Sequence, residues 1–197
     1  PLTKLYKSYI KLGFGSNKTP FAELCLSNTR STKHAIGFNY HHFSSSGKIN
    51  DYGFPGFSDN EVSAYAKKFY KNHLLSTDID YTRNVIHYYG FLSEQFTEIT
   101  KDSTRQRFNR IGAQINYKST YIDSSRLNHD FSLQYYNLSD LFETMENHLA
   151  FNTLINKNIN LLGKSISSQN IVIKALTHYY NNVNRNDTSN TGLVHIL

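Results

Sequence analysis

The sequence predicts an all-β protein, folded as one antiparallel up-and-down meander of nine to ten strands. The first observation is the alternation of apolar and polar residues, with period two, along most of the 197 residues. The second is the lack of any convincing helical period, which excludes strand–helix–strand units and favours an antiparallel meander. The third is composition: there are 15 Tyr and 13 Phe but no Trp, a balance that favours strands.

Nine segments carry the alternation, and a tenth begins at Leu193. The predicted strands are residues 9–16, 21–27, 34–43, 62–69, 73–90, 110–117, 130–136, 148–155 and 170–180. In the first three, the apolar side chains that share a face are Ile10, Leu12, Phe14, Ala22, Leu24, Leu26, Ile36, Phe38 and Tyr40. In residues 73–90, Leu75, Thr77, Ile79 and Tyr81 face away from Ser76, Asp78, Asp80 and Thr82. In the later segments the apolar set is Ile111, Ala113, Ile115, Tyr117, Phe131, Leu133, Tyr135, Leu149, Phe151, Ile155, Ile171, Ile173 and Ala175.

Two segments are ambiguous. Residues 139–151 are the nearest approach to a helix, with a pattern like a capping box that is off by one residue, and we predict a strand for their second half. Residues 156–168 show no clear pattern.

Three features separate a soluble sandwich from a transmembrane barrel, and they favour the barrel. Several runs reach the roughly nine residues that a tilted strand needs to cross a bilayer. The residues opposite the apolar side chains are polar enough to line a water-filled interior. A soluble sheet with one solvated face would show the same alternation. Long connections follow residues 34–43 and 73–90, whereas short ones follow 21–27 and 62–69, as at the two rims of an outer-membrane barrel.

Tyrosines sharpen this prediction, because they sit on the apolar face near strand ends. A tyrosine there can bury its ring and keep its hydroxyl hydrated, as the aromatic girdle at a membrane interface requires. The girdle candidates are Tyr40, Tyr81, Tyr117, Tyr135 and Tyr179.

The stretch "FSSSGKINDYGFPGFSDNE" (residues 43–61) is predicted to be a surface loop. Its aromatic residues are expected to form a small packed interior of their own, so that the loop folds over the mouth of the barrel.

Part of the chain resembles a known family. "SSSGKINDYGFPGFSDNE" (44–61), followed by "KKFYKNHLLSTDIDYTRNVIHYYG" (67–90), resembles barrel segments of outer-membrane proteins of Bacteroidota-type bacteria, which are TonB-dependent-receptor-like or porin-like. "YIKLGFGSNKTPFAE" (9–23) is similar to the strand and turn before that loop. The resemblance implies an outer-membrane location, a barrel larger than these residues, and import of a nutrient with a TonB-type energising partner or a surface lipoprotein.

We therefore expect residues 1–197 to form a single barrel segment, internal to a longer chain and without a visible plug domain, in the outer membrane of a Gram-negative bacterium. The expected function is uptake or passage of an unidentified solute, with membrane lipid as the second partner. Two alternatives remain. A structural or assembly subunit of that membrane would transport nothing and would not conduct ions. A soluble β-domain that binds nucleic acid or glycan would stay in solution without detergent.

The candidate site residues follow from the predicted faces. The lumen-facing candidates are Glu23, Lys67, Asp78, Asp80, Arg83, Asp130 and Lys174. The candidate ligand contacts are the loops 44–60 and 90–106, with Tyr52, Phe54 and Phe57 as the aromatic contacts.

We expect no enzyme, no cofactor and no metal. His41 and His42 point to opposite faces of a strand, so one strand cannot gather them with His34 around an ion. Asp78 and Asp80 share a face about 7 Å apart, but acid–base catalysis would need an enclosed pocket, and in a wet lumen they set ion preference instead. Cys25 has no His or Asp partner at a readable spacing.

The net charge of +6 permits an acidic partner, but Lys and Arg are scattered and form no block. Only residues 65–73, "YAKKFYKNH", interleave cations with aromatics as a single-strand nucleic-acid platform would. One strand is not a platform, so we predict no nucleic-acid partner.

Overall fold

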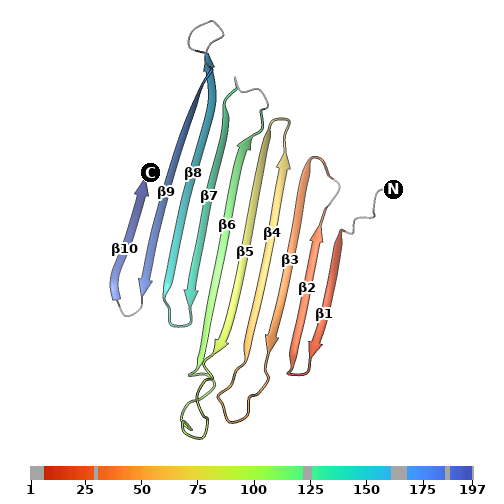
Figure 1. The fold of residues 1–197 in the computed structure, drawn as a ribbon, viewed down its shortest axis with the longest axis vertical. Helices are drawn as coiled ribbons and strands as arrows, with labels where there is room; N and C mark the ends of the chain where they lie inside the picture. The colour runs from red at the N-terminus through yellow and green to blue at the C-terminus, as the bar shows by residue number, and fades with distance from the viewer. Residues whose placement is uncertain (1–6, 29–30, 122–125, 161–167, 185–186, 197) are drawn as a thin grey trace.

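The structure is a computed structural model that describes residues 7–28, 31–121, 126–160, 168–184 and 187–196. These residues form one antiparallel sheet whose ten strands follow each other in sequence order (Figure 1). The strands are β1 Ser8–Gly15, β2 Thr19–Ser27, β3 His34–Ser45, β4 Phe57–Phe69, β5 His73–His87, β6 Arg105–Ser119, β7 Asn128–Asp140, β8 Met145–Asn160, β9 Ser168–Asn184 and β10 Asp187–Ile196. Each strand pairs with its sequence neighbour, so the predicted all-β up-and-down meander is confirmed.

The strands are longer than the apolar alternation alone indicates. β4 begins at Phe57 and β6 at Arg105, several residues before the alternation becomes visible in the sequence. The reason is that backbone N–H and C=O groups pair whatever their side chains are, so a ladder continues past the apolar positions once its register is set. β5 and β6, for example, pair without a break from His73–Ser119 to His87–Arg105.

The two ambiguous segments are resolved in part. Residues 139–151 hold the end of β7, a turn and the start of β8, so the strand predicted for their second half is confirmed. The helix-like pattern there is a turn, in which the Asp140 carboxylate accepts N–H bonds from Phe142 (2.8 Å) and Thr144 (2.9 Å). Of residues 156–168, the first five end β8 and the last begins β9, while 161–167 lie outside the described residues.

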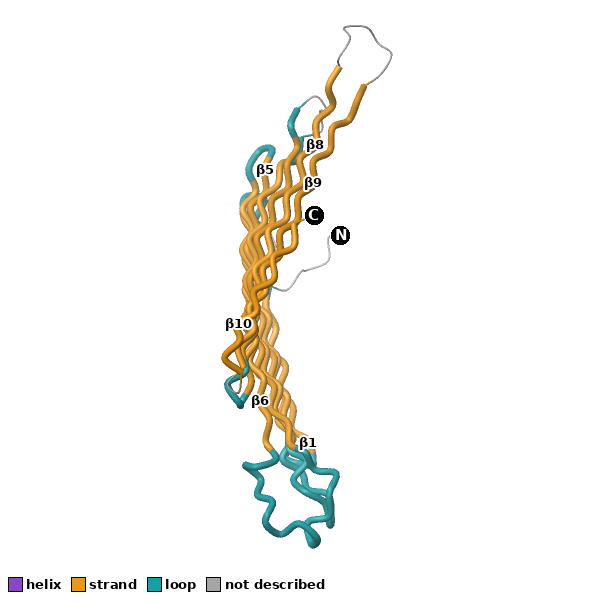
Figure 2. The backbone as a smooth tube through the Cα atoms, turned by 90° about the vertical axis from the view of Figure 1, so that its left-hand side faces the viewer, coloured by secondary structure: helices purple, strands orange, loops and turns teal. Residues whose placement is uncertain are grey.

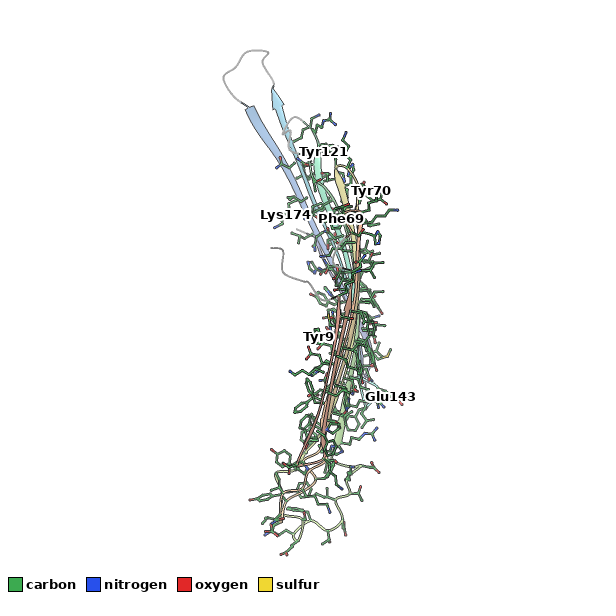
Figure 3. The ribbon with its side chains drawn as sticks, turned by 90° about the vertical axis from the view of Figure 1, so that its right-hand side faces the viewer. Tyr9, Phe69, Tyr70, Tyr121, Glu143 and Lys174 are labelled. Atoms are coloured by element: carbon green, nitrogen blue, oxygen red, sulfur yellow. The ribbon has the colours of Figure 1, made fainter. Side chains whose placement is uncertain are left out.

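The sheet is a single layer, and in the described part of the chain nothing packs over either face (Figures 2 and 3). Ala150 is the one buried hydrophobic residue among those described. Ile79 and Leu133, in the middle of the sheet, remain 50% and 42% exposed. Since stable soluble domains bury their apolar faces against a second layer, these strands lack the packed core of a sandwich.

β1 and β10 form the two edges of this sheet, and no pairing between them occurs among the described residues. None of those residues forms a helix, so no helix among them is suited to span a membrane.

The two long connections, residues 46–56 and 88–104, lie at the same end of the sheet (bottom of Figure 1). They pack on each other: Gly53 N–H bonds to the Phe91 carbonyl (3.1 Å) and Ser93 N–H to the Asp51 carbonyl (2.9 Å). The expectation that the first loop has an interior of its own is therefore corrected. Its interior is shared with the second loop, because the meander brings both connections to the same rim.

Candidate functional site

The register of the ladder divides the side chains between two faces, because directly paired residues project to the same side of an antiparallel sheet. The face that we call the polar face contains the paired row Cys25, Asn39, Ser63, Asp80, Gly112, Tyr136, His148 and Tyr180. The face that we call the apolar face contains the paired row Leu26, Phe38, Ala64, Ile79, Ala113, Tyr135, Leu149 and Tyr179.

The apolar sets predicted from separate segments all fall on the apolar face, as far as their side chains are described. Ile171 and Leu193 lie outside the described side chains. Along β5 this aliphatic band runs from Leu75 to Tyr81, about 20 Å at the rise of an antiparallel strand. The apolar sets predicted in eight strands therefore belong to one continuous surface, which β4 joins through Ala64.

Tyrosines border this band toward the long-loop end of the sheet. The Tyr81 hydroxyl donates to Asn109 Oδ1 at 3.4 Å, and the Tyr135 hydroxyl donates to Asn147 Oδ1 at 3.1 Å. In both cases the asparagine lies on the same face, two residues from the tyrosine's pairing partner and outside the aliphatic band. Each tyrosine therefore lies on the apolar face at the edge of the band, with its hydroxyl bonded to an asparagine outside it.

The opposite border of the band is also aromatic. The His73 ring stacks on Tyr117 (5.5 Å between centroids), and His129 stacks on Phe131 (5.1 Å). Tyr117 thus lies at the other border from Tyr40, Tyr81, Tyr135 and Tyr179, and the band has an aromatic margin at both ends.

Charge is divided between the faces. All eight carboxylates in β1–β9 lie on the polar face, and the apolar face has none among the strand residues that the structure describes. They are Glu23, Asp59, Glu61, Asp78, Asp80, Asp130, Asp140 and Glu146. The charged side chains on the apolar face of the described strands are all cations, and they lie outside the aliphatic band. They are Lys68, Arg83, Arg105, Arg107 and Lys157.

The polar face holds a connected polar network at its centre. Asp80 on β5 pairs with Arg110 on β6, and the Arg110 guanidinium lies 5.4 Å from the centre of the Tyr136 ring on β7. The Tyr136 hydroxyl donates to Glu146 Oε1 at 2.5 Å. Gly112 makes room for this arrangement, since a Cβ there would lie 2.5 Å from the Asp80 carboxylate.

Aromatic rings continue the network toward β9. His148 is 8% exposed and stacks on Tyr180 with 4.2 Å between ring centroids. Its Nε2 lies 3.2 Å from Nδ1 of His178, so one of these two rings donates to the other. One ion pair and a series of hydrogen-bonded or stacked rings therefore lie at the centre of the polar face.

Two shallow hollows on the polar face contain several of the predicted residues. One, of about 370 Å³, is lined by Asp130 and Lys174, and the Asp130 carboxylate there accepts a bond from Asn116 Nδ2 at 2.6 Å. The other, of about 250 Å³, is lined by Glu23 and Glu61, with the Tyr9 hydroxyl donating to Glu23. These hollows are the places on the polar face where a solute could contact several groups together.

Six of the seven predicted lumen residues lie on the polar face, and one does not. Arg83 pairs with Asn60 and Asn109 on the apolar face, two residues past Tyr81, so grouping it with the other six is corrected. Period two along β5 already placed Arg83 with Tyr81, and that signal could have found the error.

The three predicted loop contacts are dispersed. Tyr52 is 47% exposed in the first loop, where its backbone pairs with Leu92 of the second loop. Phe54 packs edge-on against His87 of β5, with 4.9 Å between ring centroids. Phe57 is the first residue of β4, on the polar face, and its ring lies 5.3 Å from that of Phe43.

The residues weighed as metal ligands or as an acid–base pair lie apart on the sheet. Among the described residues, no group of three or more His, Cys, Asp or Glu side chains is placed to hold a metal ion. His41 lies on the polar face, opposite to His34 and His42, as strand geometry predicted. Asp80 forms an ion pair with Arg110, so its carboxylate interacts with a cation on β6 rather than with Asp78.

Sequence reasoning missed Arg110, Tyr136, Glu146 and His148. Period two could assign each to the polar face, but their contacts depend on cross-strand register, which the sequence of one strand does not contain. Comparison of the chain with protein-family models, curated proteins and solved structures gave no match.

Proposed function

We propose that this chain is part of an antiparallel β-barrel that crosses the outer membrane of a Gram-negative bacterium and lets solutes pass along its polar face. The observation that carries the proposal is the apolar face, which the described chain leaves uncovered although it is aliphatic across nine strands. Hydrocarbon tails cover such a surface without any second protein layer.

Strand length supports a membrane rather than an aqueous setting. β5 and β6 have 15 residues each, β8 has 16 and β9 has 17. A tilted strand needs about 9–11 residues to cross a bilayer, and strands of soluble proteins usually have about five or six. The extra residues carry the ladder past both aromatic margins into the polar zones.

The division of charge supports the same orientation. A carboxylate on the lipid side would lie against hydrocarbon or beside anionic headgroups, and both situations are unfavourable. The apolar face avoids carboxylates throughout the described strands and has cations only beyond the band. The polar face, with its carboxylates, the Asp80–Arg110 ion pair and two hollows, suits contact with water and solutes.

Cysteine labelling tests the orientation of the two faces, because the chain has a single cysteine, Cys25, on the polar face. In the whole protein reconstituted in lipid, we expect a charged, membrane-impermeant thiol reagent to modify Cys25. In the matched variant, Leu24→Cys with Cys25→Ser, only a lipid-soluble maleimide should react. Mass spectrometry of the peptide that contains residues 24 and 25 reads both reactions. Equal labelling of the two positions by the charged reagent would mean that water bathes both faces and would refute the barrel.

Conductance in planar bilayers tests solute passage. A porin-like barrel gives steady channels, and modification of Cys25 by a bulky charged reagent should lower their conductance. A receptor of the TonB type would instead give uptake that stops when the membrane is de-energised. Correct labelling without channels or uptake would favour the non-transporting structural subunit.

A further inference from the structure

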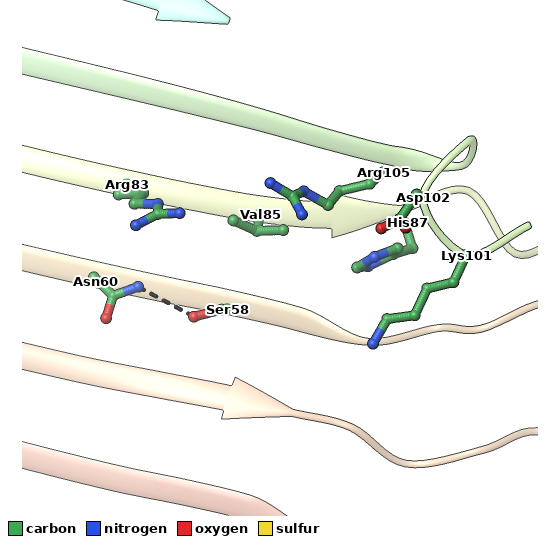
Figure 4. Close-up of a pocket in the computed structure, with 8 residues that line it drawn as sticks. All are labelled: Ser58, Asn60, Arg83, Val85, His87, Lys101, Asp102 and Arg105. Carbon is green, nitrogen blue, oxygen red and sulfur yellow. Dashed lines mark hydrogen bonds between the residues drawn. The ribbon is translucent and has the colours of Figure 1, made fainter. Parts of the chain in front are cut away.

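A third hollow lies on the apolar face, outside the polar network, at the end of the sheet where the long loops are (Figure 4). It has a volume of about 590 Å³ and is lined by strand residues of β4, β5 and β6 together with Lys101 and Asp102 of the second long loop. Its strand residues all belong to the apolar face by register. Arg83 enters it two residues beyond Tyr81, about 7 Å past the aromatic border along the strand.

The hollow is cationic. Arg83, Lys101 and Arg105 outnumber the one acid, Asp102. None of these four side chains forms an ion pair within the part of the chain that is described, where Arg110–Asp80 is the one salt bridge. Two buried nitrogens at the site have no partner there either, Nε of Arg105 and Nε2 of His87.

Packing fixes two of the basic groups at the hollow, Lys101 and His87. His87 Nδ1 donates to the Gly56 carbonyl at 2.6 Å, which ties the end of β5 to the first loop. The Lys101 ammonium lies 4.0 Å from the centre of the Phe54 ring. Phe54 also contacts His87, so the shared interior of the two loops holds Lys101 and His87 beside Arg83 and Arg105, which come from the strands.

This arrangement fits a phosphate group. Guanidinium groups bind phosphate oxygens through paired N–H donors, and a lysine adds a point charge. Ser58 and Asn60, which also line the hollow, add neutral polar groups on β4. The location selects the source of the phosphate, because a headgroup bound here would leave its acyl chains against Tyr81 and the aliphatic band.

We propose that this cluster, Arg83, Lys101 and Arg105, binds the phosphate of an anionic lipid headgroup on the long-loop side of the membrane. The inference rests on the membrane orientation in the proposed function, but it concerns a site that takes no part in solute passage.

The test uses the whole protein in nanodiscs of phosphatidylcholine that contain a titrated fraction of phosphatidic acid, with bound phosphatidic acid counted by native mass spectrometry. The double variant Arg83→Gln, Arg105→Gln should bind phosphatidic acid at least about 10-fold more weakly, because it loses two charge-assisted contacts. The control, Lys68→Gln with Lys157→Gln, removes the same charge from the other end of the apolar face and should bind as the parent does.

Three outcomes would overturn the site: unchanged binding in the double variant, equal loss in the control, or displacement of the lipid by an equal concentration of inorganic phosphate. The double variant with both arginines replaced by lysine keeps the charge, and it should recover only part of the affinity. Conductance of the same samples reports the proposed function separately. Channels without retained phosphatidic acid overturn the headgroup site alone, and retained lipid without channels overturns solute passage alone.

Discussion

Leu133→Arg places a charge in the middle of the aliphatic band. Leu133 lies between Phe131 and Tyr135 along β7 and between Ile115 and Phe151 across the sheet, and it is 42% exposed in the described chain. On the lipid face of a barrel, arginine at the bilayer midplane costs about 2–4 kcal/mol, but only about 0–1 kcal/mol near an interface. A water-exposed position would instead change the free energy of unfolding by about 0.5 kcal/mol or less.

Ser139→Arg is the matched control, because Ser139 lies on the same face of the same strand, six residues and about 20 Å further along. Urea titration of the protein folded into lipid vesicles, followed by the gel mobility of the folded barrel, would give both free energies. We expect the Leu133 variant to be less stable than the Ser139 variant by at least about 1.5 kcal/mol, from the depth dependence above. Equal stabilities would refute the assignment of hydrocarbon to this face, and a lipid-free soluble fold of the parent would do so as well.

Three further changes test the polar face and the loops. Gly112→Ala forces its Cβ to within 2.5 Å of the Asp80 carboxylate, so we expect a loss of about 1–3 kcal/mol in the same urea titration. Asp130→Asn removes a carboxylate from the larger hollow of the polar face, and the reversal potential under a salt gradient should show weaker preference for cations. Phe54→Ala removes the ring shared by the two long loops, and limited proteolysis should cut residues 88–104 faster while the strands stay protected.

Each of these changes has its own control. Gly90→Ala adds the same methyl group where no atom lies within 4 Å, and it should leave stability unchanged. Tyr52→Ala removes an exposed aromatic from the same loop as Phe54 and should not speed proteolysis. If Asp130→Asn and Arg83→Gln altered ion preference equally, the separation of the two faces would be wrong.

Much of the fold could be predicted because period two is a local property. Ile10 and Leu12, or Ile111 and Ile115, fall on one face of a strand whatever that strand pairs with. The boundaries were less predictable, since ladder bonds continue through polar residues such as Arg105 and Arg107, where the alternation no longer stands out.

For the candidate site, the face of each residue was predictable, whereas the contacts between residues were not. The sequence could place Asp80, Arg110 and Glu146 on polar positions of three strands, but their contacts arise from the pairings of Asp80 with Gly112 and of Tyr136 with His148. A shift of one residue in either ladder would turn those side chains to the other face. The face of Arg83, in contrast, did not depend on register, because Arg83 lies two residues from Tyr81 and therefore shares its face.

The strand class and the two chemically different faces follow from the order of the residues alone, because a strand turns successive side chains to opposite sides through local backbone geometry. The folded sheet was needed to show which side chains meet across strands, how the two long loops share one interior around Phe54, and that Arg83, Arg105 and Lys101 line one hollow. These contacts join residues that are distant in the chain, so they depend on the register of hydrogen-bonded pairs rather than on any single segment.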